Sequence, residues 1–183
     1  MRELPDDIIK NYSKFKLLNL EKNLVNYIVD FKLEDISWRS LTKEEMEIFL
    51  LDNYCVDNNY HTWDNGSILG MHYLQWYLYT DKYFIGTVKN NIGKETIVGC
   101  ISYFNYHKIY GNVNYVSTVE INYFYQGMGL SKIMYEKFVN EIDFNKDIML
   151  TTESLIGRKC YVMGNFKKVL KKNNFDKKII IDD

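Results

Sequence analysis

The spacing of apolar residues changes repeatedly along the chain between the period of a strand and that of a helix, which predicts a mixed α/β fold. Six runs rich in β-branched and aromatic residues are predicted strands: Ile36–Leu41, Tyr83–Val88, Thr96–Phe104, Val116–Tyr123, Asp147–Thr152 and Lys177–Ile181. Apolar residues at every third or fourth position predict helices over residues 6–32 (one or two helices), after Thr42, over Ile68–Tyr79, from Leu130 and over Cys160–Asn173.

Short polar signals mark a helix start and a turn. Thr42 and Glu45 have the spacing of a capping box, and the helix that they open carries three apolar residues toward the core, Met46, Phe49 and Leu50. The segment between the second and third predicted strands has the composition of a hairpin turn. Its turn-forming residues are Asn90, Asn91 and Gly93.

The stretch from Val119 to Met134 joins the fourth predicted strand to the next helix through a turn with two glycines, Gly127 and Gly129. The first N–H groups of a helix have no partner inside it, and the helix dipole is positive there, so such a turn can bind phosphate. Glycine permits positive φ and the close approach of an anion. The spacing is neither that of a P-loop nor GxGxxG. The alternative is an ordinary strand–turn–helix corner of an α/β protein.

Charge, cysteine and histidine content and hydropathy argue against several classes of protein. The 183 residues carry a formal net charge of −1, so no global field favours nucleic acid or an acidic membrane. Three separated cysteines without a CxxC pair indicate a reducing compartment, and three scattered histidines give no metal-ligand spacing. No signal peptide and no apolar run of membrane-spanning length are found. We expect a cytoplasmic monomer or homodimer with no metal, membrane span or nucleic-acid partner.

The turn resembles the Gln/Arg-x-x-Gly-x-Gly/Ala signature of the GNAT acyltransferases, read here from Gln126 to Ser131. The opening Arg-x-Leu-Thr-x-Glu-Glu from Arg39 and the order of predicted elements are similar to that superfamily too. The resemblance implies the GNAT fold, a mixed, largely antiparallel central sheet flanked by helices. It assigns residues 36–183 to the acyltransferase domain and residues 1–35 to an added N-terminal helical segment packed on it.

The resemblance also implies an activity and a set of ligand contacts. In that superfamily the turn holds the pyrophosphate of an acyl-coenzyme A, so acetyl-CoA or another acyl-CoA is the expected co-substrate and an amine the acceptor. The residues expected to bind the coenzyme are Ile121, Asn122, Gln126, Gly127, Met128, Gly129, Leu130, Ser131 and Asn165.

Candidate catalytic residues follow from the chemistry of amine acylation. A protonated amine must lose a proton, and Glu120 in the fourth predicted strand is the candidate base, with Glu153 as the alternative. Each carboxylate can equally be an ordinary solvated or loop acid. Many relatives place a tyrosine in the last helix as the acid for the leaving thiolate, but Leu170 stands at that position. The substitutes considered are Tyr123, Tyr125 and Tyr161.

A second, narrower resemblance concerns the coenzyme-binding half of N-myristoyltransferases. Its landmarks are Leu51–Asp57, Leu74–Leu78, Val98–Ser102 and Val119–Tyr123. It favours a peptide or protein amine over a small-molecule acceptor and opens the alternative of long-chain acyl transfer. The absence of a tyrosine at the position of Leu170 suggests a further alternative, a coenzyme-binding domain without catalysis.

The basic residues of the C-terminal quarter form either a solvated face or contacts to coenzyme phosphates.

Overall fold

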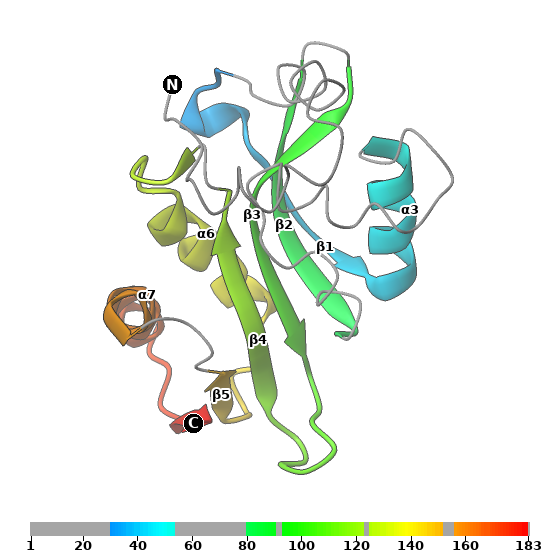
Figure 1. Cartoon of the computed structure of the whole chain (residues 1–183). Helices are drawn as coiled ribbons and strands as arrows, with labels where there is room; N and C mark the ends of the chain where they lie inside the picture. The colour runs from blue at the N-terminus through cyan, green and yellow to red at the C-terminus, as the bar shows by residue number, and fades with distance from the viewer. Residues whose placement is uncertain (1–29, 54–79, 91–92, 123–124, 152–155, 183) are drawn as a thin grey trace.

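The computed structural model describes residues 30–53, 80–90, 93–122, 125–151 and 156–182, with the backbone alone described for residues 47, 50, 51, 151, 156–163 and 182. The elements, in chain order, are the 3₁₀ helix η1 (Leu33–Asp35), β1 (Ser37–Thr42), α3 (Lys43–Asn53), β2 (Lys82–Lys89), β3 (Glu95–Phe104), β4 (Asn114–Ile121), α6 (Leu130–Phe138), the 3₁₀ helix η4 (Val139–Glu141), β5 (Ile148–Thr151), α7 (Ile156–Lys172) and β6 (Ile179–Asp182) (Figure 1).

The described strands form one sheet in the order β1-β2-β3-β4-β5-β6. The first four pair antiparallel, while β4 with β5 and β5 with β6 pair parallel. Parallel neighbours need a crossover connection, and here α6 and α7 supply it. The sheet is therefore mixed and largely antiparallel, as the sequence predicted, and the described elements follow the order expected for a GNAT fold.

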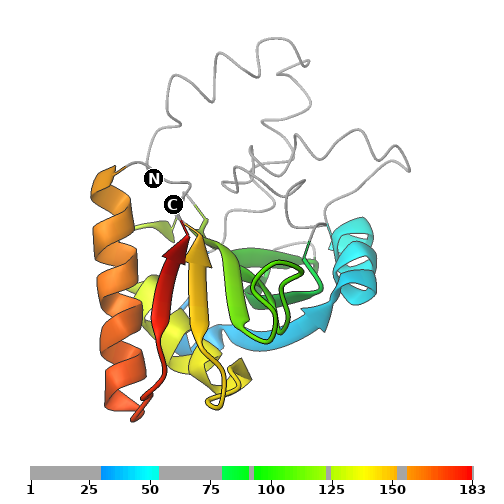
Figure 2. The same cartoon turned by 90° about the horizontal axis from the view of Figure 1, so that it is seen from below.

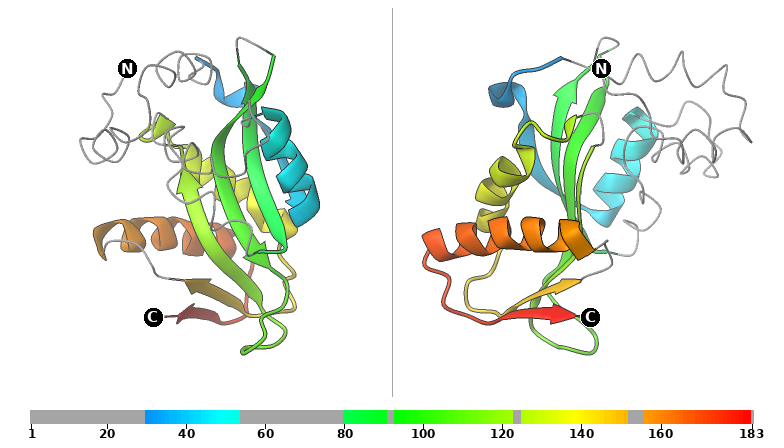
Figure 3. Two further views of the ribbon diagram at one scale, coloured as in Figure 1. Left: turned by 45° about the vertical axis from the view of Figure 1, so that its right-hand side comes forward. Right: turned by 60° about the vertical axis from the view of Figure 1, so that its left-hand side comes forward.

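Helices cover both faces of this sheet, with α6 and α7 on one side and α3 on the other (Figures 2 and 3). The alternation of side chains along β1 shows the two faces directly. Trp38 packs against the core cluster under α6 and α7, whereas the guanidinium of Arg39 lies 5.4 Å from the ring centroid of Phe49 in α3. The core cluster on the α6 side includes Met134 and Phe138.

The local signals read from the sequence are confirmed. The N–H of Thr42 donates to Glu45 Oε2 at 2.7 Å and the N–H of Glu45 to Thr42 Oγ1 at 3.2 Å, which is the predicted capping box. Met46 and Phe49 of α3 are buried. In the β2–β3 hairpin, the N–H of Lys94 donates to Asn90 Oδ1 at 2.8 Å. The predictions for Asn91 and for the side chain of Leu50 lie outside the described residues.

Other boundaries differ from the prediction. Strand β4 begins at Asn114 and ends at Ile121, two residues earlier than expected at each end, and α7 begins at Ile156 rather than Cys160. Residues 30–32, placed at the end of an N-terminal helix, are not helical and lead into η1. The rest of that helical segment and the helix Ile68–Tyr79 lie outside the described residues.

The end of α7 is closed by an asparagine in a conformation that glycine usually adopts. Asn174 adopts φ 59°, in the left-handed region. The N–H of Asn174 donates to the carbonyl of Lys171 at 3.1 Å, and the N–H of Phe175 to that of Leu170 at 3.0 Å. This is a Schellman motif, whose left-handed position asparagine tolerates better than other non-glycine residues.

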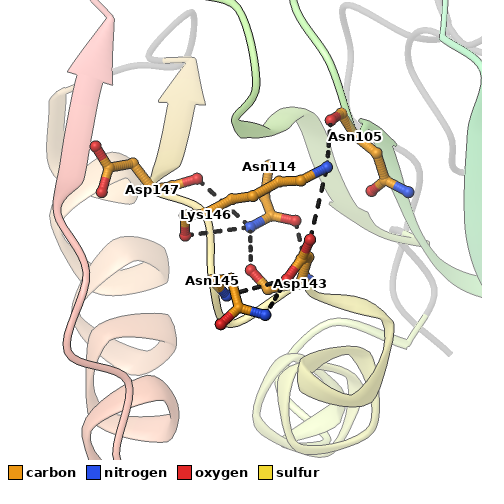
Figure 4. Close-up of polar contacts among 6 residues, drawn as sticks. All are labelled: Asn105, Asn114, Asp143, Asn145, Lys146 and Asp147. Atoms are coloured by element: carbon orange, nitrogen blue, oxygen red, sulfur yellow. Dashed lines mark hydrogen bonds and ion pairs between the residues drawn. The ribbon is translucent and has the colours of Figure 1, made fainter.

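A buried asparagine at the start of β4 fixes the loop that leads into β5 (Figure 4). The side-chain amide of Asn114 donates to the carbonyl of Asp143 at 2.8 Å and accepts from the N–H of Asp143 at 3.1 Å. Its backbone N–H donates to the carbonyl of Asp147 at 2.8 Å. Nearby, Lys146 Nζ donates to the carbonyl of Asn105 at 3.0 Å, which ties this loop to the β3–β4 connection.

Replacing Asn114 by alanine should lower the free energy of unfolding by about 2 kcal/mol, because it removes a buried amide and leaves the partly buried N–H and carbonyl of Asp143 without their partner. Denaturant unfolding measures the change. The control is Asn145→Ala, which removes an exposed amide whose Nδ2 lies 3.2 Å from Asp143 Oδ1. We expect less than about 0.5 kcal/mol for the control. Equal losses in the two variants would contradict this role of Asn114.

An ion pair ties β1 to β3 on the α3 side of the sheet. The guanidinium of Arg39 donates to both carboxylate oxygens of Glu95, at 3.1 and 2.7 Å, and Thr87 Oγ1 donates to Glu95 Oε1 at 2.8 Å. Burial acts to raise the pKa of Glu95, but the hydrogen bonds from Arg39 and Thr87 outweigh it, so this pKa lies below its ordinary value of 4.5.

The Glu95→Gln variant should therefore be about 1 kcal/mol less stable than the wild type at neutral pH, allowing for the partial exposure of the pair. Because the folded-state pKa is depressed, this contribution is complete above pH 4.5 and disappears as the pH falls through the folded-state pKa. Unfolding curves at several pH values should converge for the two proteins in acid. A difference that stays constant with pH would contradict the ion-pair explanation.

Candidate functional site

Strand β4 separates from β5 halfway along its length. Among the described residues, β5 pairs with β4 only from Asn114 to Val116 (Figure 1). The next residue, Ser117, is an extra residue between the pairs that Val116 and Thr118 make with β3, which is a β-bulge. A bulge bends its strand and increases the local twist. The second half of β4, up to Ile121, therefore continues along β3 with its other edge turned away from β5.

The backbone of Ile121 faces that other edge. The N–H of Asn122 donates to the carbonyl of Val98 at 3.0 Å, so the pair of Ile121 with Gly99 is one that exchanges no hydrogen bonds. The N–H and C=O of Ile121 therefore point away from β3. Its carbonyl accepts a hydrogen bond from Gln126 Nε2 at 3.2 Å, and its N–H donates to no acceptor within the described part of the chain.

Asn122 holds the turn against β3. Its side chain is buried and donates through Nδ2 to the carbonyl of Ile97 at 2.9 Å, and its carbonyl accepts from the N–H of Tyr125 at 2.9 Å. The N–H of Asn122, one of the residues expected to bind the coenzyme, donates within the sheet to the carbonyl of Val98. Below the turn, Tyr125 and Leu130 are buried together with Val88 in a second small core, so the turn rests on packed side chains.

The two-glycine turn is exposed and opens onto the start of α6. Gly127 has φ 89° and Gly129 has φ 78°, both in the left-handed region, and Met128 between them is 43% exposed. The N–H groups of Gly129, Leu130 and Ser131 donate to no acceptor among the described residues. A Cβ added at Gly129 would meet no atom of the described residues within 4 Å. Open space, unpaired amides and the positive end of the helix dipole fit the approach of a phosphate group.

Glu120 lies on the other face of β4 from the core. Val119 and Ile121 pack against the core on the α6 side, so the side chain of Glu120 between them points to the α3 side. Directly opposite, on β3, Cys100 is completely buried. Burial, and then the carboxylate of Glu120, raise the pKa of the Cys100 thiol well above its ordinary value, so the thiol stays protonated at neutral pH.

Two hydroxyl groups next to Glu120 were not singled out from the sequence. Thr118 precedes Glu120 by two residues on the same face of β4, and it pairs with Ser102 of β3. Ser102 Oγ lies 2.5 Å from Thr118 Oγ1. The two-residue spacing of Thr118 and Glu120 in a predicted strand could have indicated that their side chains share a face. The pairing of Thr118 with Ser102 depends on the bulge at Ser117.

The structure describes only some of the remaining predicted site residues. Leu170 is 1% exposed and belongs to the core cluster, so no polar group occupies the position where many GNAT proteins carry a tyrosine. Asn165 lies half-buried on α7. Tyr161 belongs to α7 by its backbone, and its side chain lies outside the described residues. Tyr123 and Glu153 also lie outside them.

Six lysines of the C-terminal quarter are exposed: Lys167, Lys168, Lys171, Lys172, Lys177 and Lys178. The side chains of Arg158 and Lys159 lie outside the described residues. In the part of the chain that the structure describes, no group of three or more histidine, cysteine, aspartate or glutamate side chains could hold a metal ion. No helix there has both the length and the apolar character needed to cross a bilayer.

Comparisons with known proteins find similarity among solved structures. No protein-family model matches the chain, and no curated protein matches it. Among solved structures, it is similar to an aminoglycoside acetyltransferase from an uncultured soil metagenomic sample, crystallised in complex with trehalose. The identity is 13%, the TM-score is 0.41, and the alignment covers 75% of this chain and 88% of the other.

Proposed function

We propose that this protein is an acyl-coenzyme A-dependent N-acyltransferase that transfers an acetyl group from acetyl-CoA to an amine. The observation that carries the proposal is the exposed turn between β4 and α6, with positive φ at Gly127 and Gly129 and three N–H groups without described acceptors. The diphosphate of the coenzyme would bind the N–H groups of Gly129, Leu130 and Ser131. This site lies at the end of a strand whose free edge can receive the rest of the coenzyme.

The N–H of Ile121 is the proposed donor to the thioester carbonyl. When an amine attacks that carbonyl, negative charge develops on its oxygen, and a fixed N–H donor stabilises it. Ile121 is suited to this role because its N–H points away from β3, on the side from which β5 has separated. Val119, two residues earlier, has the same backbone orientation and extends the row of donors.

Glu120 is the proposed base. The acceptor amine is protonated near neutral pH, so a carboxylate must take one proton before the nitrogen can form a bond to the acyl carbon. The nitrogen then loses its second extra proton to solvent and the C–S bond breaks. The thiolate takes up a proton from a tyrosine, for which Tyr123 and Tyr161 are the candidates, or from water. The hydroxyls of Thr118 and Ser102, on the same face as Glu120, can orient the acceptor.

The acceptor is proposed to be the amine of a peptide or protein, on the resemblance to N-myristoyltransferases, with a small-molecule amine as the alternative. A second candidate function is a coenzyme-binding domain without catalysis. The complete burial of Leu170, where many relatives carry a tyrosine, favours this second candidate.

One assay separates these functions. Release of free thiol from acetyl-CoA is measured with a panel of amines, including peptide N-termini, lysine and aminoglycosides, and the acyl chain is then lengthened stepwise to myristoyl. An acetyltransferase should turn over acetyl-CoA and reject long chains, whereas a long-chain enzyme should show the reverse preference. Tight coenzyme binding without turnover on any amine would establish the binding domain and contradict the enzymatic proposal.

A further inference from the structure

The connection between β3 and β4, residues 105–113, is a hairpin tip held in one shape by its own contacts. His107 and Gly111 exchange two backbone hydrogen bonds, at 2.8 and 2.7 Å. The N–H of Ile109 donates to His107 Nδ1 at 3.2 Å. The imidazole stacks on the rings of both Tyr110 and Tyr115, with centroid distances of 4.9 and 4.6 Å. The side chains at the apex are therefore presented in fixed positions.

Three large apolar side chains of this hairpin tip face solvent. Ile109 is 80% exposed, Tyr106 60% and Tyr110 43%. Single exposed apolar residues are common on protein surfaces, but here three such residues stand within five residues of one hairpin tip. The backbone of the tip projects beyond the start of β5 (Figures 1 and 3).

The surroundings of the hairpin tip are basic. The segment Ile101–Val119 contains no aspartate or glutamate and carries Lys108 next to the apex. Because β5 and β6 run parallel to β4, the segments that lead into them, residues 142–147 and residues 171–178, which include the last two residues of α7, lie at the same end of the strands as the tip. Together, the tip and these two segments carry three aspartates and six lysines, Lys108, Lys146, Lys171, Lys172, Lys177 and Lys178.

We propose that the hairpin tip docks this protein onto an anionic lipid bilayer. Tyrosine and isoleucine side chains enter the interfacial region of a bilayer readily, with the hydroxyl group of tyrosine at the headgroup level, and neighbouring lysines attract anionic headgroups. A projecting hairpin with exposed apolar side chains and nearby lysines combines insertion into the bilayer with attraction to its headgroups. The eight residues of β4 separate the tip from the two-glycine turn by roughly 25 Å, so docking leaves the turn accessible.

Vesicle flotation with the full chain tests this proposal. The protein is mixed with phosphatidylcholine vesicles that contain phosphatidylserine, or with pure phosphatidylcholine vesicles. We expect binding to the anionic vesicles alone, weakening as salt rises. The double variant Tyr106→Ser/Ile109→Ser should bind at least about tenfold more weakly, because it removes the apolar side chains that enter the bilayer. Lys108→Glu should weaken binding at low salt more than at high salt.

The control variant is Ile48→Ser, which removes an isoleucine of α3 that is 59% exposed. It should bind anionic vesicles like the wild type, and thermal unfolding should show that all variants fold. Three outcomes overturn the proposal: no flotation of the wild type with anionic vesicles, equal losses in the tip and Ile48 variants, or unchanged binding of a folded double variant. Tip-dependent contact with a purified protein, in the absence of vesicle binding, would likewise overturn it.

Discussion

Gly129→Glu should weaken coenzyme A binding by about a hundredfold or more, because it places a carboxylate in front of the N–H groups proposed to hold the diphosphate. A Cβ at this position meets no atom of the described part of the chain within 4 Å, so the fold should survive the substitution. The left-handed backbone at φ 78° adds a cost of about 1–2 kcal/mol in stability. Calorimetric titration measures the affinity, and thermal unfolding measures the stability.

The matched control for this variant is Gly111→Glu. Gly111 has φ 74°, and a Cβ added there also meets no described atom within 4 Å, so the control has the same backbone strain and the same added charge. It lies in the β3–β4 connection, at the opposite end of β4 from the turn. We expect it to bind coenzyme A like the wild type. Wild-type affinity in Gly129→Glu, or an equal loss in both variants, would contradict the assignment of the turn.

Glu120→Gln should lower kcat/KM for the acylation of an amine by about a hundredfold at neutral pH, as expected when a general base is removed. The loss should shrink as the pH rises toward the pKa of the acceptor, because a growing fraction of the amine is already neutral. Measuring kcat/KM across this pH range for both proteins tests the role. A loss that stays constant with pH would remove Glu120 as the base and leave it a structural or binding residue.

The control for this prediction is Glu136→Gln, which removes a half-buried carboxylate from α6, on the face of the sheet opposite to Glu120. Its pH profile should match that of the wild type. Coenzyme affinity should be unchanged in both variants, because neither residue belongs to the turn. The affinity measurement therefore distinguishes a role in proton transfer from a role in coenzyme binding. A loss of coenzyme binding in Glu120→Gln would show that its effect is not on proton transfer.

Much of the fold follows from local signals in the sequence. The β-branched and aromatic runs gave the strands within a few residues, and the capping box at Thr42 and Glu45 appears with both hydrogen bonds. The start of β4 was missed because Asn114 reads as a loop residue. Its side chain in fact forms hydrogen bonds with Asp143, 29 residues away, and local propensity cannot predict a contact with a residue so distant in the sequence.

The site was predictable in part. Orphan N–H groups at the start of a helix follow from the two glycines and from the helical spacing after them. The role of Asn122 was not predictable, because its amide bonds to Ile97 across the sheet. The bulge at Ser117, which accompanies the separation of β4 from β5, depends on the register with β3. Registers are set by tertiary contacts, and a sequence pattern with period two does not reveal one extra residue.

The most direct test is to titrate the wild-type protein with coenzyme A and, separately, with pantetheine, which has the same thiol arm but no diphosphate. If the amides of Gly129, Leu130 and Ser131 hold the diphosphate, calorimetry should show saturable binding of coenzyme A and at least about a hundredfold weaker binding of pantetheine. Equal affinity for the two compounds, or no heat of binding with coenzyme A, would contradict the account.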